Sequence, residues 1–128
     1  MEIEIICTEA DGRKLSEHIK DTEFACKDGT REILYSPDLI DVLEAIRNHF
    51  DNPIIINSGY RTPAWNAKVG GVSNSYHCKG MAADIHVKGR TSKEVAEYAN
   101  KIMTTGGIIQ YTNFVHIDVR GYKYRKGV

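Results

Sequence analysis

Two short segments of the chain alternate polar and apolar residues, and this alternation limits the fold more than any other feature of the sequence. In "AADIHV" (82–87) and "FVHIDVR" (114–120), β-branched residues fall on one face of an extended strand. The opposite face carries Asp84 and His86 in the first segment and Phe114, His116, Asp118 and Arg120 in the second. Such segments predict a sheet with one face against a core and the other presenting polar groups. If the two strands are neighbours, Asp84 and His116 can converge.

Helices and further strands are predicted around these segments. Residues 37–50 carry apolar side chains at helical spacing, with Ser36 as the N-cap and a proline in the first turn. Residues 92–103 form a second amphipathic pattern, opened by Thr91 and Glu94 as a capping box. The other expected elements are strands at 2–7, 54–57 and 108–111, a short helix at 64–69, a loop at 73–80, a hairpin turn at Thr112–Asn113 and a loosely ordered basic tail at 121–128. Residues 8–36 are mixed and polar. This order predicts an α+β domain with helices gathered on a small, mainly antiparallel sheet.

Size and charge exclude several classes of protein. The 128 residues suit one domain with a hydrophobic core. The 17 basic residues balance 17 acidic ones, so neither nucleic acid nor an anionic membrane is expected as the main partner. No apolar run approaches the roughly 20 residues that span a bilayer. The acidic start lacks signal-peptide features, and Cys7, Cys26 and Cys78 lack CxxC spacing. We therefore expect free thiols and synthesis in the cytoplasm.

Polar residues gather in the stretch "SNSYHCKGMAADIHV" (73–87). It holds His77, Asp84 and His86, and His116 follows on the other alternating strand. Two neutral imidazoles and one carboxylate are a catalytic zinc set that leaves a fourth position for water. By spacing alone the pattern is weak, because a single histidine or aspartate is more often solvated or part of a turn. The residues by themselves leave open a zinc site or a polar loop before an ordinary strand.

Longer motifs add a family resemblance. "INSGYRTPAWNAKVGGVSNSYHCKGMAADI" followed by "GGIIQYTNFVHIDVR" resembles the zinc D-Ala-D-Ala carboxypeptidases and phage endolysin peptidases, peptidase family M15. The resemblance covers about residues 22–120, and its pattern of SGYR, SxHxxGxAxD and FVHxD is specific. It implies a hedgehog/DD-peptidase-like α+β fold and one zinc ion per chain. By this match, His77, Asp84 and His116 are the zinc ligands.

The resemblance also assigns residues to the substrate. Arg61, in "SGYR", looks like the family arginine that holds the substrate's carboxylate or scissile carbonyl, which suits a permanently charged, forked guanidinium. Ser75 looks like a substrate-contacting serine. Trp65 and Asn66 are expected to be packing and helix-surface residues, and Gly80 is expected to shape the loop.

The chain departs from the family pattern at the general base. Many relatives carry Glu or Asp three residues before the last ligand, where this chain has Asn113, which cannot take up a proton. Asp118 is the best replacement, since it shares a strand face with His116. Its alternative role is to orient His116 through a hydrogen bond. We expect Asp118 to act as the base and His86 to be a solvated strand histidine.

The predicted function is a zinc peptidase that cuts peptidoglycan stem peptides, as a D-Ala-D-Ala carboxypeptidase or an endolysin-type endopeptidase. Residues 1–128 would form this single domain and act as a monomer. It would serve a phage or prophage as an endolysin, or a host in wall remodelling, and would reach the cell wall only if released. The alternative is a non-catalytic zinc-binding module for attachment to the wall or to a protein, which Asn113 keeps open. A phage structural component with a vestigial site is less consistent with the retained ligands and arginine.

Overall fold

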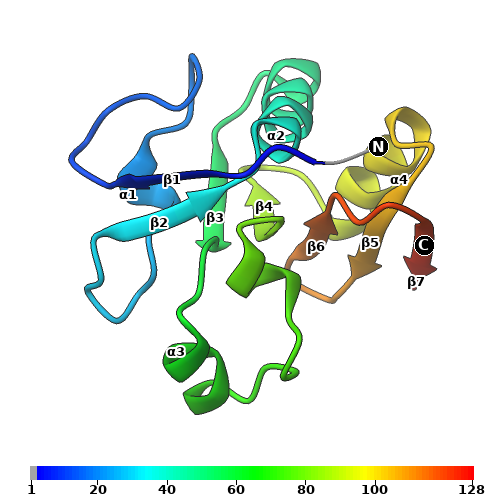
Figure 1. The fold of residues 1–128 in the computed structure, drawn as a ribbon. Coiled ribbons are helices and arrows are strands. Elements are labelled where there is room, and N and C mark those ends of the chain that lie inside the picture. Colours follow the sequence, from blue (N-terminus) through cyan, green and yellow to red (C-terminus); the bar gives the residue numbers. More distant parts are fainter. Residues whose placement is uncertain (1–2) are drawn as a thin grey trace.

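The computed structural model describes residues 3–128 and builds them around a five-stranded sheet of strand order β3-β4-β6-β5-β7 (Figure 1). The elements are β1 (Ile6–Glu9), α1 (Asp21–Phe24), β2 (Glu32–Tyr35), α2 (Pro37–Phe50), β3 (Ile54–Ser58), α3 (Pro63–Lys68), the 3-10 helix η1 (Tyr76–Lys79), β4 (Ala82–Val87), α4 (Ser92–Ile102), β5 (Gly106–Gln110), β6 (Val115–Asp118) and β7 (Lys123–Lys126). All neighbouring strands of this sheet are antiparallel except β5 and β7, which are parallel. Strands β1 and β2 form a separate antiparallel pair. The predicted α+β class, with helices on a mainly antiparallel sheet, is confirmed.

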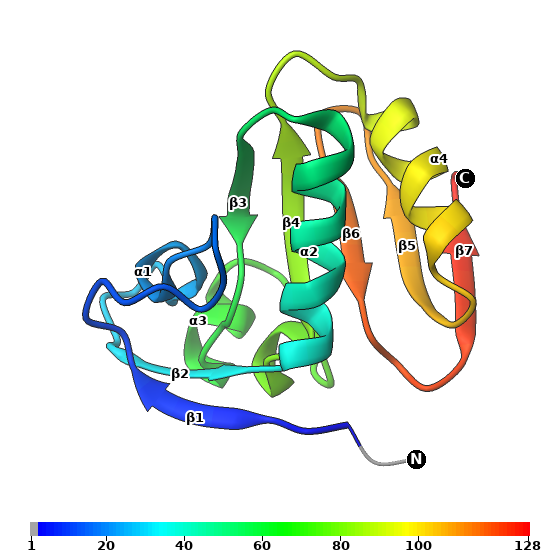
Figure 2. The same cartoon turned by 90° about the horizontal axis from the view of Figure 1, so that it is seen from above.

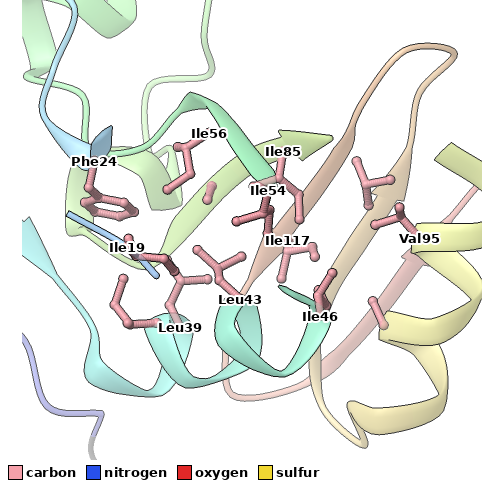
Figure 3. Packing of buried hydrophobic residues seen from close by; sticks show 14 of the residues in the cluster. Ile19, Phe24, Leu39, Leu43, Ile46, Ile54, Ile56, Ile85, Val95 and Ile117 are labelled. Carbon is pink, nitrogen blue, oxygen red and sulfur yellow. The ribbon is translucent and has the colours of Figure 1, made fainter. Parts of the chain in front are cut away.

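Helices α2 and α4 lie on the same face of the five-stranded sheet (Figure 2). Their apolar sides pack against the β-branched residues of the two alternating strands, and Leu43, Ile46 and Val95 meet Ile85 and Ile117 in one buried cluster (Figure 3). Because side chains alternate along a strand, this packing turns the polar residues of β4 and β6 to the opposite face of the sheet. The core therefore decides which face can carry a site.

The two long helices begin where the sequence predicts. The Ser36 hydroxyl oxygen accepts the Leu39 N–H at the start of α2, and Pro37 occupies the first turn. Thr91 and Glu94 form the expected reciprocal capping box at the start of α4. Caps of this kind satisfy N–H groups that have no partner inside the helix. Both predicted helices are confirmed to within one residue.

Strands β4 and β6 are neighbours, as the convergence of polar residues requires. Their register places Asp84 directly opposite His116 and Ala82 opposite Asp118. Strand β5 pairs with the other side of β6 through the predicted hairpin. Residues opposite each other in an antiparallel pair have Cβ atoms about 5 Å apart, so their side chains can share one ligand.

The N-terminal third contains more structure than expected. The predicted strand 2–7 is found later, at Ile6–Glu9, and Glu2 lies outside the described residues. The polar stretch 8–36 contains α1 and β2, and the predicted loop 73–80 contains η1. These elements have only four residues each, so they show no periodicity and depend on tertiary contacts. Cys7, Cys26 and Cys78 are free thiols, as predicted.

The C-terminal tail is ordered, which corrects the prediction for residues 121–128. Residues Lys123–Lys126 form β7 and pair with β5. The Arg125 guanidinium fixes this strand by donating to the carbonyl oxygens of Gly106 and Met103. A short charged segment is typical of an edge strand, because its charges hinder pairing with the strand of another molecule. In sequence, however, the same segment looks like a disordered tail. None of the helices within residues 3–128 is long and apolar enough to cross a membrane.

Candidate metal centre

Three side chains from η1, β4 and β6 meet on the polar face of the sheet. His77, Asp84 and His116 each offer a ligand atom, and these atoms all lie within 4.8 Å of one another. His77 Nε2 is 3.3 Å from Asp84 Oδ1, and His116 Nδ1 is 3.0 Å from the same oxygen. The structure thus brings together the residues predicted as metal ligands. Two imidazole nitrogens directed at one carboxylate oxygen define a single place for a cation.

His77 is oriented by backbone groups. Its own N–H donates to the Ser75 hydroxyl oxygen, which caps η1. Its Nδ1 is 2.8 Å from the Gly59 carbonyl oxygen. Since a carbonyl can only accept, Nδ1 carries the proton and Nε2 is left with its lone pair toward the site. Gly80 then ends η1 with φ 74°, and any Cβ at this position would collide with the backbone of Leu34 in β2, so glycine is required there.

His116 is oriented by Asp118. Its Nε2 lies 2.8 Å from Asp118 Oδ2, so Nε2 donates and Nδ1 faces Asp84. The Asp118 carboxylate also accepts Nε–H and Nη2–H of Arg120, at 2.8 and 2.6 Å, and the backbone N–H of Gly107 at 3.0 Å. The Asp118 side chain has no exposed surface. Water therefore cannot reach it in this arrangement, and the contacts favour the orienting role over the predicted role of base.

The charges of the two aspartates suit cation binding. Burial alone would raise the pKa of Asp84, but His116 and His77, which can donate to it when protonated in the metal-free protein, hold that pKa well below its ordinary value. Burial likewise opposes ionisation of Asp118, but Arg120 and His116 hold the pKa of Asp118 well below its usual range. A carboxylate with so low a pKa ligates cations readily and takes up a proton poorly.

Arg61 is fixed beside the three candidate ligands. Its Nε donates to Ser58 Oγ at 3.0 Å, its Nη1 to Asn66 Oδ1 at 3.1 Å, and its Nη2 to Asp84 Oδ2 at 3.3 Å. A guanidinium has five N–H donors, so two are left for a ligand. Arg61 lines the same cleft as the candidate ligands. The predicted anchor for a carboxylate or carbonyl oxygen is therefore held rigidly and keeps donors available.

Asn66 has a larger part than the sequence suggested. It was expected on the surface of the short helix, but it is 3% exposed. Its Oδ1 accepts from Arg61, and its Nδ2 donates to the Val72 carbonyl oxygen at 2.7 Å. A Cβ on Gly71 would collide with the Asn66 side chain. Glycine at position 71 therefore lets the loop pass close to Asn66 and Arg61. Asn66 thus holds both Arg61 and the loop after α3, whereas Trp65 packs against the core as expected.

A cleft of about 490 Å³ lies over the candidate centre. Arg61, Ser75 and the three candidate ligands line it. The loop after α3 contributes Gly70–Val72, and the β5–β6 hairpin contributes Tyr111 and Phe114, whose rings stack at 4.5 Å between centroids. The cleft therefore combines a charged floor with an apolar platform.

Carboxylates are scarce in this cleft. Asp84 is the only one among the described residues that line it. Asn113 is exposed and lines a different pocket, together with His86. His86 Nδ1 is 2.8 Å from Asn57 Oδ1, and among residues 3–128 the cluster of His77, Asp84 and His116 does not include it. Within the described part of the cleft, no second carboxylate is available to act as the general base expected from the resemblance.

Comparison with known proteins identifies relatives of this chain. Peptidoglycan L,D-endopeptidase MepK of Escherichia coli K12 is 34% identical over 91 residues, which cover 64% of this chain and 50% of that protein. The protein of the same name from Shigella flexneri matches to the same extent. Zinc D-Ala-D-Ala carboxypeptidase of Streptomyces albus G is 48% identical over 44 residues, or 34% of this chain and 17% of that protein. The match thus spans half the length of the MepK relatives.

A family model described as Peptidase M15 matches residues 7–118. The match begins earlier than the resemblance over residues 22–120, because it takes in most of β1 and the segment between β1 and α1. It contains Arg61, Ser75 and all three candidate ligands. The chain belongs to the peptidase M15 family.

Proposed function

We propose that this domain is a zinc peptidase that hydrolyses peptide bonds in peptidoglycan stem peptides. One zinc ion per chain would be held by His77, Asp84 and His116. The observation that carries the proposal is the convergence of two imidazole nitrogens on Asp84 Oδ1 at the floor of a cleft that also contains Arg61. Family membership and the names of the relatives support the peptide and peptidoglycan classes of substrate.

The residues fit zinc by their chemistry. Two neutral imidazoles and one carboxylate are the donors of a catalytic zinc site, and a position is left for water or substrate. Hydrogen bonds from His77 to Gly59 and from His116 to Asp118 fix each ring with one nitrogen toward the site. All three ligands line the cleft, so a substrate can reach them. When bound, zinc supplies Lewis-acid chemistry that polarises a carbonyl and activates water.

The remaining residues bind and orient the peptide. Arg61 would hold a substrate carboxylate or the scissile carbonyl and stabilise negative charge that develops on its oxygen. The Ser75 hydroxyl accepts from His77 and keeps its own proton to donate to the substrate. Asp118 would orient His116 so that the Nδ1 atom of His116 faces the metal. The predicted role of Asp118 as general base stays a prediction that its contacts disfavour.

A second candidate function is a non-catalytic zinc-binding module that attaches to the cell wall or to a protein. One observation favours it: the described residues of the cleft include no carboxylate besides the ligand Asp84. Such a module would bind zinc and peptidoglycan with no turnover. Binding and cleavage measured on the same material separate the two functions.

Digestion of purified peptidoglycan tests the proposal. Zinc-loaded protein is expected to release soluble peptides, whose masses identify the bond that is cut. Chelator-treated protein and Arg61→Lys are the matched controls, and both are expected to release far less. Retention of zinc-loaded protein on peptidoglycan without any released product would instead support the attachment module.

We also propose the cell wall as the place of action, since the proposed substrate lies there. The predicted release of the protein, as a phage or prophage endolysin or in wall remodelling by a host, stays a prediction. Purified protein added to cells with a permeabilised outer membrane is expected to lower the turbidity of the suspension. Unchanged turbidity, with peptidoglycan digestion intact, would argue against a lytic role.

A further inference from the structure

We infer that Arg120 is a positioning residue for the metal centre and that β7 holds it in place. The inference rests on the proposed metal site of His77, Asp84 and His116. It assigns a role to the C-terminal strand, which no part of the proposed reaction uses. A chain of contacts runs from Tyr124 on β7 through Arg120 and Asp118 to His116.

The contact between Arg120 and Asp118 fixes the carboxylate plane. Arg120 Nε donates to Asp118 Oδ1 at 2.8 Å, and Arg120 Nη2 donates to Asp118 Oδ2 at 2.6 Å. Two parallel bonds between a guanidinium and a carboxylate prevent rotation of either group. Asp118 Oδ2 is also the oxygen that accepts from His116 Nε2. A fixed carboxylate therefore fixes the imidazole ring and the direction of its Nδ1.

Aromatic rings hold Arg120 in turn. Its guanidinium carbon lies 4.6 Å from the ring centroid of Tyr76, 4.5 Å from that of Tyr124 and 5.5 Å from that of Tyr122. The side chain of Arg120 is only 11% exposed, so these cation–π contacts are partly shielded from water. Tyr76 belongs to η1 and precedes His77, whereas Tyr124 belongs to β7. Arg120 thus lies between the C-terminal strand and the 3-10 helix that carries the first ligand.

Strand β7 reaches the site through its register with β5. Tyr124 lies opposite Gly107, and the Gly107 N–H donates to Asp118 Oδ1 at 3.0 Å. A Cβ on Gly107 would collide with Asp118 and lie 2.8 Å from Arg120 Nε, so the ion pair occupies the space above this glycine. The position of β7 is therefore coupled to the geometry of Asp118.

Stability alone is a weak explanation for this arrangement. A buried ion pair is often replaced by apolar residues without loss of stability, because removing two charges from water is costly. Here the pair is buried and its carboxylate contacts a candidate metal ligand. Apolar residues in place of the pair could not accept a hydrogen bond from His116 Nε2–H, as Asp118 does.

Zinc affinity and the visible spectrum of the Co²⁺-loaded protein test the inference. Arg120→Gln is expected to weaken zinc binding several-fold, by less than the about 10- to 100-fold that loss of a direct partner of a metal ligand causes. Arg120→Lys keeps the charge and loses the fork, so it should fall between Arg120→Gln and the parent protein. Tyr124→Ala should weaken binding to a smaller extent. Lys123→Ala, at an exposed position of the same strand, is the matched control and should bind as the parent does.

The outcomes separate this inference from the proposed function. Failure of the parent protein to bind zinc would overturn both. If the parent binds zinc, and folded Arg120→Gln, Arg120→Lys and Tyr124→Ala keep its affinity and its Co²⁺ spectrum, then Arg120 does not position the metal centre and the inference is wrong. Circular dichroism of the metal-free proteins checks folding. Should Arg120→Gln not fold, Arg120→Lys and Tyr124→Ala carry the same comparison.

Discussion

Four N–H donors and one imidazole nitrogen surround the two carboxylate oxygens of Asp118. They come from Gly107, from the backbone and side chain of Arg120 and from His116. A carboxylate has about four lone-pair positions, so none is left for a water proton. At the scale of single residues, the main feature of the site is that hydrogen bonds from neighbouring residues fix the proposed ligands. Asp84 is fixed in a similar way: Arg61 donates a hydrogen bond to its carboxylate, and Asn66 accepts a hydrogen bond from Arg61.

Replacement of Asp118 by asparagine distinguishes its two possible roles. If Asp118 orients His116, Asp118→Asn should weaken zinc affinity by about 10- to 100-fold, and excess zinc should restore part of the activity. If Asp118 is the base, the variant should stay inactive with zinc fully bound, because an amide cannot take up the proton. The measurement is the rate of peptidoglycan cleavage against zinc concentration. We expect partial recovery, and inactivity at saturating zinc would restore the role of base.

Arg61→Lys should reduce the cleavage rate by about 10²- to 10³-fold, because lysine keeps the charge but loses the planar fork. Zinc content at saturating zinc and the circular dichroism spectrum should stay at the parent values, because lysine keeps a positive charge beside Asp84 and all three proposed ligands remain. Arg31→Lys, at an exposed position, is the matched control. Near-normal cleavage by Arg61→Lys would make this arginine a structural residue.

At the scale of elements, the sequence predicts the parts that are long or strictly alternating. Helices α2 and α4 have 14 and 11 residues, enough for an apolar face and a cap to be recognised. The alternation in β4 and β6 places the polar face correctly. The buried Asn66 could not be found this way, because α3 has only six residues and packing against Gly71 and Val72 decides its inner face.

The structure of β7 and of residues 8–36 depends on contacts that are distant in sequence. Lys123–Lys126 becomes a strand because β5 offers a free edge, and nothing in its own composition shows that partner. The three ligands came from a family resemblance, and the sequence already offered Asp118 as a partner that could orient His116. The short elements and the contacts made by Gly59, Gly107 and Arg120 depend on the folded chain and were beyond the sequence-based prediction.

Glu44 connects α2 to the loop before α1, and this connection should depend on pH. Burial would raise the pKa of Glu44, but hydrogen bonds from Ser16 and His18 lower it below the ordinary 4.5. A lowered folded-state pKa stabilises the protein above the unfolded value, and this stabilisation is lost as the pH falls through the folded value.

Glu44→Gln should therefore lower the free energy of unfolding at pH 7 by about 1.5 to 3 kcal/mol, the usual range for hydrogen bonds to a charged group. The difference from the parent should shrink in acid, below about pH 4.5. Urea unfolding of both proteins at a series of pH values measures this difference in the free energy of unfolding. A difference that does not change with pH would show that the charge of Glu44 is irrelevant.

At the scale of the whole molecule, the sheet separates stability from chemistry. Helices α2 and α4 cover one face of the sheet (Figure 2). The candidate metal centre occupies the other face. Ile117 follows His116 and precedes Asp118 in sequence, but its side chain lies in the core (Figure 3). Substitutions on the two faces should thus have separate effects, although the residues are adjacent along the chain.

Ile117→Val tests this separation. Loss of one buried methylene should reduce the free energy of unfolding by about 0.5 to 1.5 kcal/mol. Zinc affinity should stay within about twofold of the parent value, because side chains alternate along β6 and that of Ile117 points away from the proposed ligands. Urea unfolding of the metal-free protein and a chelator competition provide the two numbers. A tenfold loss of zinc affinity in this variant would show that the core and the metal centre are coupled.

Zinc content per chain, measured by elemental analysis after removal of free metal, tests the central claim most directly. The parent protein should hold one zinc ion, and His86→Ala should hold the same, because His86 bonds to Asn57 away from the cluster. His116→Ala should lose the metal, since only two of the three proposed ligands remain. Full zinc occupancy in His116→Ala would contradict the proposed centre of His77, Asp84 and His116.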